Sequence, residues 1–261
     1  MHKLSVISMF KNESMIIQEW IEHNIKEGVE HFYLIDNGSD DNYIDKIKKY
    51  MNLITLVKDP YRKKLGTQTE LFNKHFLDII KKETEWVIVI DIDEYVYSRN
   101  GYSKITDYIN KISDDISQII LPWKMFGSNT IIKQPLSIIS SFTKREDNSR
   151  FKNRIKSSHF GYCKALTRVS RLKQIETHKP TLNSGCIRFS DFSELDGFNT
   201  YFIEKQYIHI NHYTNMSLEY YTNIKIKRGG GQGGVYTLNR FNHENTVFNE
   251  VEDIELKNKE T

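Results

Sequence analysis

Hydrophobic and polar positions alternate in two patterns along the first ninety residues. Short runs of apolar, often β-branched residues are each followed by a longer stretch in which apolar residues recur every three or four positions. The first pattern is typical of buried strands and the second of amphipathic helices. Strands are predicted at residues 4–10, 31–35, 54–57 and 86–90, with helices near 16–25, 43–51 and 67–82. This alternation predicts an α/β fold with a parallel sheet, helices on both faces and right-handed connections.

The pattern is looser beyond residue 94. A helix is predicted over residues 103–112 and a last helix after Ser217, which can cap it. Further strands are predicted at residues 118–123, 164–169, 174–178 and 207–213. Pro122 indicates that the strand at 118–123 lies at a sheet edge or ends near that residue.

Two polar stretches in this second half are expected to lack regular structure. Residues 137–158 are polar and basic, including Lys144, Arg145, Arg150, Lys152, Arg154 and Lys156, and indicate a mobile loop or lid. The tail from His243 is acidic and polar, and we expect it to be poorly ordered.

Composition narrows the class of protein. A chain of 261 residues with 38% hydrophobic residues can form one large domain with a substantial core. The net charge of +3 is too small to indicate a nucleic-acid partner. No apolar run approaches the roughly 20 residues of a membrane span, and residues 1–10 do not resemble a signal peptide. Cys163 and Cys186 lack disulfide or metal spacing, so a soluble cytoplasmic protein is expected.

Three acidic residues follow the apolar strand at 86–90. Asp91, Asp93 and Glu94 leave the sheet together, and ligands of open α/β sheets bind beyond the carboxyl ends of strands. We expect the two aspartates to have no Lys or Arg partner and therefore to bind a hard divalent cation, which prefers oxygen ligands. Aspartates that cap a turn after a strand are the competing interpretation.

Four stretches of the chain resemble the GT-A glycosyltransferases of families 2 and 92. They are residues 11–13 with 20–23, residues 33–41, residues 90–95, and residues 211–213 with the helix ending at 227–229. The resemblance implies a GT-A (Rossmann-like) three-layer α/β sandwich, with a mostly parallel central sheet and a small mixed C-terminal acceptor region. It implies a single catalytic domain at 1–240, with a nucleotide-binding half (1–100), an acceptor-binding half (101–240) and a polar tail (241–261).

The same resemblance implies a metal-dependent sugar transfer from a nucleoside-diphosphate sugar to a glycan or other hydroxyl acceptor, with inversion as the favoured outcome. Asp91, Asp93 and His212 would hold Mn²⁺ or Mg²⁺ on the diphosphate. The residues implied on the donor side are Lys11, Asn12, Glu13, Asp36, Gln68 and Ile92. Glu94 and Trp123 are implied on the acceptor side. The sequence does not identify the general base: Asp147, His178 and Glu146 are the candidates, and Asp191 and Glu194 stay open. Neither nucleic acid nor a transmembrane segment is expected, and the oligomeric state stays open.

Several of these residues also have an ordinary structural interpretation. Asp36 precedes Asn37, Gly38 and Ser39, a sequence that suits an Asx-type turn. Asn12 could cap the first helix, Trp123 could belong to the core, and His212 could be a structural histidine. Two rival functions remain at this stage: a metal-dependent nucleotidyltransferase and a non-catalytic carbohydrate-binding module. The residues after the first strand are not the glycine-rich phosphate loop that the first rival would favour.

Overall fold

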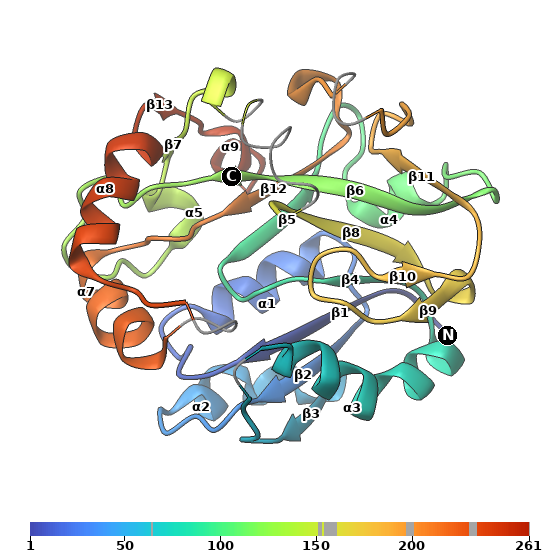
Figure 1. Cartoon of the computed structure of the whole chain (residues 1–261), viewed down its shortest axis with the longest axis horizontal. Coiled ribbons are helices and arrows are strands. Elements are labelled where there is room, and N and C mark those ends of the chain that lie inside the picture. The colour runs from blue at the N-terminus through green and yellow to red at the C-terminus, as the bar shows by residue number, and fades with distance from the viewer. Residues whose placement is uncertain (64, 151–152, 154–160, 197–200, 230–233, 261) are drawn as a thin grey trace.

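A computed structural model describes residues 1–63, 65–150, 153, 161–196, 201–229 and 234–260 (Figure 1). Strands and helices alternate over the first ninety residues, as predicted. The elements are β1 (His2–Phe10), α1 (Ile17–Lys26), β2 (His31–Asp36), α2 (Tyr43–Ile47), β3 (Ile54–Lys58), α3 (Thr67–Glu83) and β4 (Thr84–Val89). A 3₁₀ helix at Lys48–Leu53 follows α2. Gly28 ends α1 with φ of 92°, a left-handed conformation that glycine adopts without strain.

One large sheet forms the centre of the described part of the chain. Its strands also include β5 (Glu94–Ser98), β6 (Ile116–Met125), β8 (Cys163–Arg168), β11 (Cys186–Phe189) and β12 (Ile208–His212). The order is β3-β2-β1-β4-β8-β6-β12-β5, and β11 also pairs with β6. Neighbours pair in parallel except at β4–β8, β8–β6 and β12–β5. The prediction of an α/β fold with a mostly parallel sheet is therefore confirmed.

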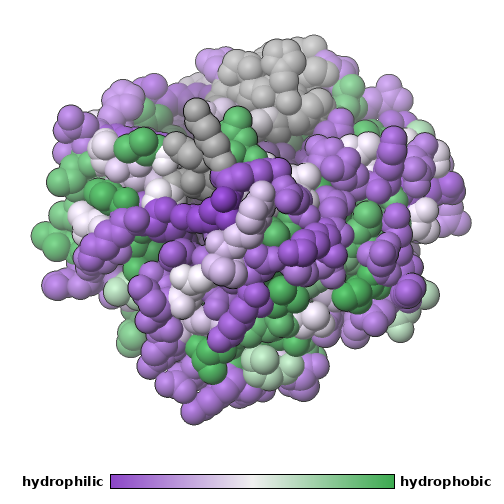
Figure 2. Space-filling view, turned by 60° about the horizontal axis from the view of Figure 1, so that its bottom comes forward, coloured by the Kyte–Doolittle hydropathy of each residue, from purple (hydrophilic) through white to green (hydrophobic). Residues whose placement is uncertain are grey.

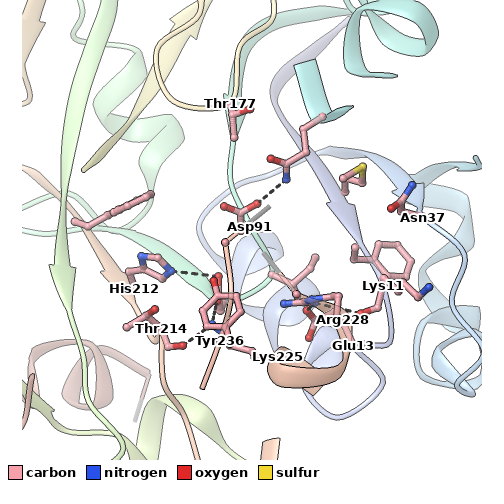
Figure 3. A pocket seen from close by; sticks show the side chains of 18 of the residues that line it. Lys11, Glu13, Asn37, Asp91, Thr177, His212, Thr214, Lys225, Arg228 and Tyr236 are labelled. Atoms are coloured by element: carbon pink, nitrogen blue, oxygen red, sulfur yellow. Dashed lines mark hydrogen bonds and ion pairs between the residues drawn. The ribbon is translucent and has the colours of Figure 1, made fainter. Parts of the chain in front are cut away.

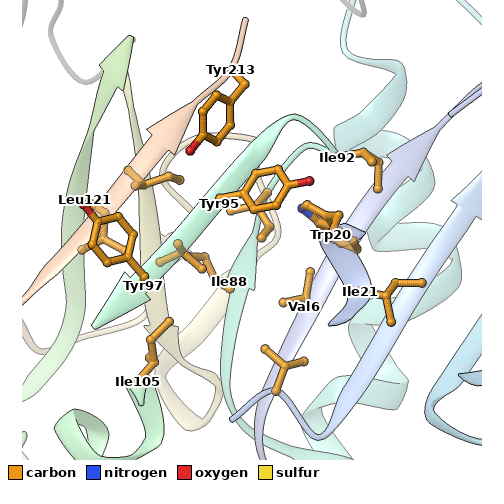
Figure 4. Close-up of a cluster of buried hydrophobic side chains, with 14 of the residues drawn as sticks. Val6, Trp20, Ile21, Ile88, Ile92, Tyr95, Tyr97, Ile105, Leu121 and Tyr213 are labelled. Atoms are coloured by element: carbon orange, nitrogen blue, oxygen red, sulfur yellow. The ribbon is translucent and has the colours of Figure 1, made fainter. Parts of the chain in front are cut away.

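Apolar side chains pack on both faces of this sheet. One cluster joins α1, α4 (Ile105–Ile109) and the sheet, and includes Trp20, Tyr95 and Tyr213 (Figure 4). A second cluster lies under α3 and includes Phe72 and Phe76. Hydrophilic side chains cover most of the face in Figure 2, with hydrophobic ones between them. In the described residues no helix has the length and apolar character needed to cross a membrane.

The edge position predicted from Pro122 was wrong, although the strand does end three residues later, at Met125. β6 runs through this residue and lies inside the sheet, between β8 on one side and β11 and β12 on the other. β11 pairs with β6 as far as Ile120, and β12 begins to pair at Trp123. Pro122 thus occupies the gap between these two neighbours, so its missing N–H removes no ladder hydrogen bond on that side.

The C-terminal tail is ordered, contrary to the prediction. It forms α8 (Leu238–Phe248), β13 (Val251–Glu252) and α9 (Glu255–Glu260). Phe241 and Leu256 are buried, and β13 pairs with β7 (Lys144–Arg145). β7 and α5 (Ile138–Ser141) lie within the predicted loop at 137–158, whose Lys152, Arg154 and Lys156 fall outside the described residues.

The remaining elements follow the predictions less closely. β9 (Leu172–Gln174) pairs with β10 (Thr181–Leu182), so most of the strand predicted at 174–178 is absent from the structure. Ser217 caps α7 (Leu218–Tyr220) as predicted, and the helix continues with π-helical hydrogen bonding over Tyr221–Ile226. Cys163 and Cys186 are free thiols.

Candidate functional site

A cavity of about 370 Å³ lies at the carboxyl ends of β1 and β4 (Figure 3). Its lining comes from parts of the chain that are far apart in sequence. The N-terminal half contributes Lys11, Glu13, Asn37, Arg62, Gln68, Asp91, Ile92 and Asp93. The later part contributes, among others, Trp123, Tyr162, Thr177, His178, His212, Thr214, Lys225, Arg228, Tyr236, Arg240, Glu244 and Phe248. Most of the residues predicted from the sequence are therefore brought to one cavity.

Asp91 follows β4 and is held by donors on both carboxylate oxygens. Gln68 donates to Oδ1 at 3.2 Å, and the ammonium of Lys164 lies 3.0 Å from Oδ2. Burial raises the pKa of Asp91, but the charge of Lys164 outweighs it and leaves the pKa below its ordinary value. The side chain remains 35% exposed and faces the cavity. Asp91 is therefore an ionised carboxylate at the cavity wall.

Asp93 is paired with a second lysine. Lys225, from the π-helical stretch, donates to Oδ2 at 2.6 Å and also to the carbonyl oxygen of Thr214. Burial raises the pKa of Asp93, but Lys225 and then His212 lower it well below the ordinary value. The expectation that the two aspartates have no Lys or Arg partner was thus wrong. Lys164 and Lys225 are 73 and 132 positions away from their partners, and no local pattern indicates such contacts.

Glu94 lies behind Asp91 and does not line the cavity. Its Oε2 accepts a hydrogen bond from the Asp91 N–H at 2.9 Å and lies 3.4 Å from the Lys164 ammonium. Burial raises the pKa of this fully buried carboxyl well above its ordinary value. In the structure Glu94 supports the turn at Asp91, and its predicted contact with an acceptor stays a prediction.

His212 approaches Asp93 from β12. Its Nε2 lies 3.5 Å from Asp93 Oδ1, and its ring packs edge-on against Trp123 at 4.5 Å between centroids. Its buried Nδ1 has no hydrogen-bond partner in the described residues. Nor do these residues contain a group of three His, Cys, Asp or Glu side chains placed to hold a metal ion. Asp93 and His212 can supply two ligands, which fits a cation that takes its other ligands from water and substrate phosphate.

The side of the cavity that is predicted to bind the donor is basic. Arg228 pairs with the buried Glu13 and donates to the carbonyl oxygen of Lys11 at 3.2 Å. Burial raises the pKa of Glu13 despite this neighbour, and the Tyr220 hydroxyl donates to Glu13 at 2.5 Å. Arg62 donates to Asn37 at 2.8 Å and to the Arg228 carbonyl at 3.2 Å. These contacts hold the guanidinium groups of Arg62 and Arg228 at the wall of the cavity that also contains Asp91 and Asp93.

Asn12 and Asp36 do not line the cavity. Asp36 accepts hydrogen bonds from Ser39 N at 2.7 Å and from the Tyr43 hydroxyl at 2.9 Å, the geometry expected of a turn aspartate. Asn12, with φ of 59°, accepts a hydrogen bond from Asp40 N at 2.9 Å. Both residues connect loops around the predicted donor side, and their contact with a nucleotide stays a prediction.

Two of the candidate bases occupy different environments. His178 lines the cavity, and its Nδ1 lies 3.1 Å from the Cys163 carbonyl oxygen. Since a carbonyl can only accept, Nδ1 carries the proton and Nε2 has a free lone pair. Burial and then Lys164 lower the pKa of His178, which keeps the ring neutral. Asp147 instead accepts hydrogen bonds from Ser149 and does not line the cavity.

The sequence interpretation gave no site role to Lys164 or α8. Arg240, Glu244 and Phe248 of α8 line the cavity, within the tail that was expected to be poorly ordered. The sequence does contain a signal for this helix, because the Thr237 side chain caps it and accepts a hydrogen bond from Arg240 N.

The fold and cavity define an α/β protein with a mostly parallel sheet and a charged site beyond its carboxyl edge. The model of Glycosyltransferase family 92 matches residues 4–259, and the chain belongs to this family, which is of the GT-A type. A family 92 protein of Arabidopsis thaliana is 31% identical over 96 residues, which is 37% of this chain and 16% of that protein. One of Ricinus communis is 23% identical over 217 residues, covering 81% and 35%. The matches thus span about a third or less of these relatives' lengths.

Solved structures show a more distant similarity. Glucosyl-3-phosphoglycerate synthase from Mycobacterium tuberculosis, crystallised with Mn²⁺, uridine diphosphate and glucosyl-3-phosphoglycerate, has a TM-score of 0.36 at 13% identity, covering 66% of this chain and 58% of that one. Mannose-1-phosphate geranyltransferase from Thermus thermophilus has a TM-score of 0.33 at 9% identity, covering 65% and 58%.

Proposed function

We propose that this protein transfers a sugar from a nucleoside-diphosphate sugar to a hydroxyl acceptor, with inversion at the transferred carbon. One observation carries the proposal: in a member of glycosyltransferase family 92, one cavity combines Asp91 and Asp93 with a basic wall. Lys11, Arg62 and Arg228 form that wall and suit a diphosphate, because guanidinium and ammonium groups give charge-assisted hydrogen bonds to phosphate oxygens.

A divalent cation, Mn²⁺ or Mg²⁺, is part of the proposal. Asp93 Oδ1 and His212 Nε2 would hold it, with Asp91 on the same turn. When bound, the cation would act as a Lewis acid on the departing diphosphate. Lys225 holds the Asp93 carboxylate in place from its other oxygen, and Lys164 does the same for Asp91.

His178 is the base that the geometry favours for this reaction. Its Nε2 would take the proton of the acceptor hydroxyl as the new carbon–oxygen bond forms. The bond from that carbon to the diphosphate breaks, and its electron pair leaves on the diphosphate oxygen. The lowered pKa of His178 keeps Nε2 unprotonated near neutral pH, as this role requires.

Thermal unfolding tests the donor site. Mn²⁺ together with one of the uridine, guanosine, adenosine, cytidine or thymidine diphosphates should raise the unfolding midpoint, because a ligand that binds the native state stabilises it. Asp93→Asn should remove the metal-dependent part of this shift and the turnover of nucleotide sugar. Asp78→Asn changes an exposed aspartate of α3 and is the matched control.

This experiment tests nucleotide binding and metal binding separately. The donor site is refuted if no nucleotide shifts the midpoint of the wild-type protein. If Asp93→Asn keeps the full metal-dependent shift and normal turnover, the metal assignment is wrong while nucleotide binding stands.

A further inference from the structure

Each aspartate of the site has a buried ammonium group beside it. Lys225 Nζ lies 2.6 Å from Asp93 Oδ2. Lys164 Nζ lies 3.0 Å from Asp91 Oδ2. The two lysine side chains are almost completely buried, so salt and water screen these charges little. Lys225 also donates to the Thr214 carbonyl oxygen, which fixes the position of its ammonium. Both carboxylates are therefore largely neutralised before any ligand binds.

The rest of the cavity has more positive than negative charge. Lys11 and Arg62 line it, and neither has an acidic partner among the described residues. Even if Glu94, which lies 3.4 Å from the Lys164 ammonium, is counted as ionised, the cationic side chains outnumber the carboxylates. The other charged groups of the wall form two ion pairs, Arg228 with Glu13 and Arg240 with Glu244.

A divalent cation on its own is a poor match for this distribution of charge. His212 Nε2 and Lys225 Nζ lie beside different oxygens of Asp93, so a cation held by Asp93 and His212 would share this carboxylate with a fixed ammonium (Figure 3). Like charges at such short range repel each other, and burial strengthens the repulsion. The described residues also contain no group of three His, Cys, Asp or Glu side chains placed to hold a metal ion. Charge and ligand number both disfavour a cation bound to the protein alone.

A nucleoside diphosphate is the better match for the cavity without a cation. Lys11 and Arg62 can bind its phosphate oxygens directly. Once the diphosphate is in place, its negative charge offsets the repulsion from Lys225, and its oxygens supply the ligands that a hard cation still needs. We propose that the nucleoside diphosphate binds without metal and that the cation enters only afterwards, in an order set by Lys164 and Lys225. This inference rests on the proposed glycosyl transfer and adds the order in which donor and cation bind.

The test measures the binding of each ligand alone. Calorimetry in EDTA follows the nucleoside diphosphate that shifts the unfolding midpoint most, and electron paramagnetic resonance of the free ion follows Mn²⁺. Wild-type protein should bind this nucleotide in EDTA and should bind Mn²⁺ alone only weakly. Lys225→Met should bind Mn²⁺ alone about tenfold or more tightly than the wild-type protein, because one nearby repelling charge is removed. Adding Asp93→Asn to this variant should abolish the gain.

Lys227→Met is the matched control, because Lys227 is exposed and does not line the cavity. Lys164→Met is a second variant that should also bind Mn²⁺ alone more tightly, and it serves if Lys225→Met does not fold. A wild-type protein that binds Mn²⁺ alone as tightly as these variants, or that binds nucleotide only when Mn²⁺ is present, would overturn the inference and leave the proposed donor site standing. A wild-type protein that binds no nucleotide with or without Mn²⁺ would overturn both.

Discussion

Two lysines beside the aspartates are buried rather than exposed to solvent. The side chains of Lys164 and Lys225 are 0% and 2% exposed. Burial lowers the pKa of each ammonium, but the neighbouring carboxylates outweigh it and raise the pKa above the ordinary value. Both groups therefore stay cationic at neutral pH, and each stabilises the charge of the carboxylate it contacts.

Replacing Lys225 tests how much its ion pair with Asp93 contributes to the free energy of unfolding. Lys225→Met leaves Asp93 buried without its ammonium, and breaking a buried ion pair typically costs about 3 kcal/mol or more. Urea titrations would measure the fall in the free energy of unfolding. Lys227→Met, which changes an exposed lysine two positions further on, should have little effect.

The same variant also reports on the proposed cation. If Asp93 binds Mn²⁺, the added ion should restore part of the stability that Lys225→Met loses, because it replaces the missing positive charge. If Lys225→Met is as stable as the wild-type protein when both are measured without metal, the ion pair between Lys225 and Asp93 does not stabilise the fold.

At the scale of residues, the sequence indicated the two aspartates of the site but not the lysines that pair with them. Asp91 and Asp93 were recognisable because they directly follow an apolar strand, and the structure brings Gln68, His178 and His212 to the same cavity. Lys164 reaches Asp91 only because β8 pairs antiparallel with β4. That pairing is a property of the folded sheet, so no local pattern of residues predicts it.

At the scale of elements, the C-terminal segment is attached to the sheet by buried charges. Lys124 of β6 contacts Asp253 at 2.9 Å and Glu255 at 3.4 Å, and Arg145 of β7 contacts Asp253 at 2.6 Å. The Tyr97 hydroxyl of β5 donates to Glu255 at 2.8 Å. Three strands thus hold the connection between β13 and α9 through polar groups.

This attachment predicts a specific dependence of stability on pH. Burial raises the pKa of Asp253, but Lys124 and Arg145 outweigh it and lower the pKa to about 2. Because the folded pKa lies below the unfolded value of about 3.9, the carboxylate stabilises the fold above pH 4 by about 2 kcal/mol. That contribution is lost as the pH falls from about 4 through 2.

Asp253→Asn tests this dependence. The variant should be less stable than the wild-type protein at pH 7, and the difference should shrink as the pH falls toward 2. Urea titrations at several pH values would measure it, with Asp78→Asn as the exposed control. A difference that stays constant from pH 7 to pH 2 would show that titration of Asp253 does not stabilise the fold.

A second prediction at this scale concerns the contact between α8 and the loop after β6. Gly127→Ala places a Cβ 2.3 Å from Asn249 Oδ1 and 2.7 Å from the Phe248 carbonyl oxygen, so α8 must shift. Overpacking of this kind costs about 1–3 kcal/mol in the free energy of unfolding. Transfer to an acceptor should fall, because the displaced helix lines the cavity. Normal transfer by a stably folded variant would contradict this role of α8.

The elements that were predicted well are those whose buried residues form a regular hydrophobic pattern in the sequence. β1, β2, β4, α1 and α3 belong to this group, because most residues of these strands and one face of each helix are buried. The C-terminal elements were missed because ion pairs and asparagine hydrogen bonds attach much of this segment to the sheet. Such residues have the same composition as a disordered tail, and only their partners distinguish the two.

At the scale of the whole molecule, the sheet and the site join the two predicted halves. β4 of the first half pairs with β8 of the second, and β5 with β12. Arg228 pairs with Glu13 across 215 positions of sequence. A nucleotide on the basic wall would contact residues from both halves, since Lys11 and Arg62 line the cavity with Arg228. The halves are therefore expected to be one cooperative unit that binds its donor as a whole.

Unfolding of the two halves should then coincide. Pulsed hydrogen exchange with mass spectrometry can follow peptides from residues 1–100 and from residues 101–240 across a urea titration. Both sets of peptides should give one shared midpoint of unfolding, because strand pairing and burial connect the two segments. A nucleoside diphosphate that binds should move both midpoints by the same amount, since it stabilises the single native state. Separate midpoints without ligand would show that the halves are independent domains. A ligand shift confined to peptides from residues 1–100 would show that Arg228 takes no part in the nucleotide site.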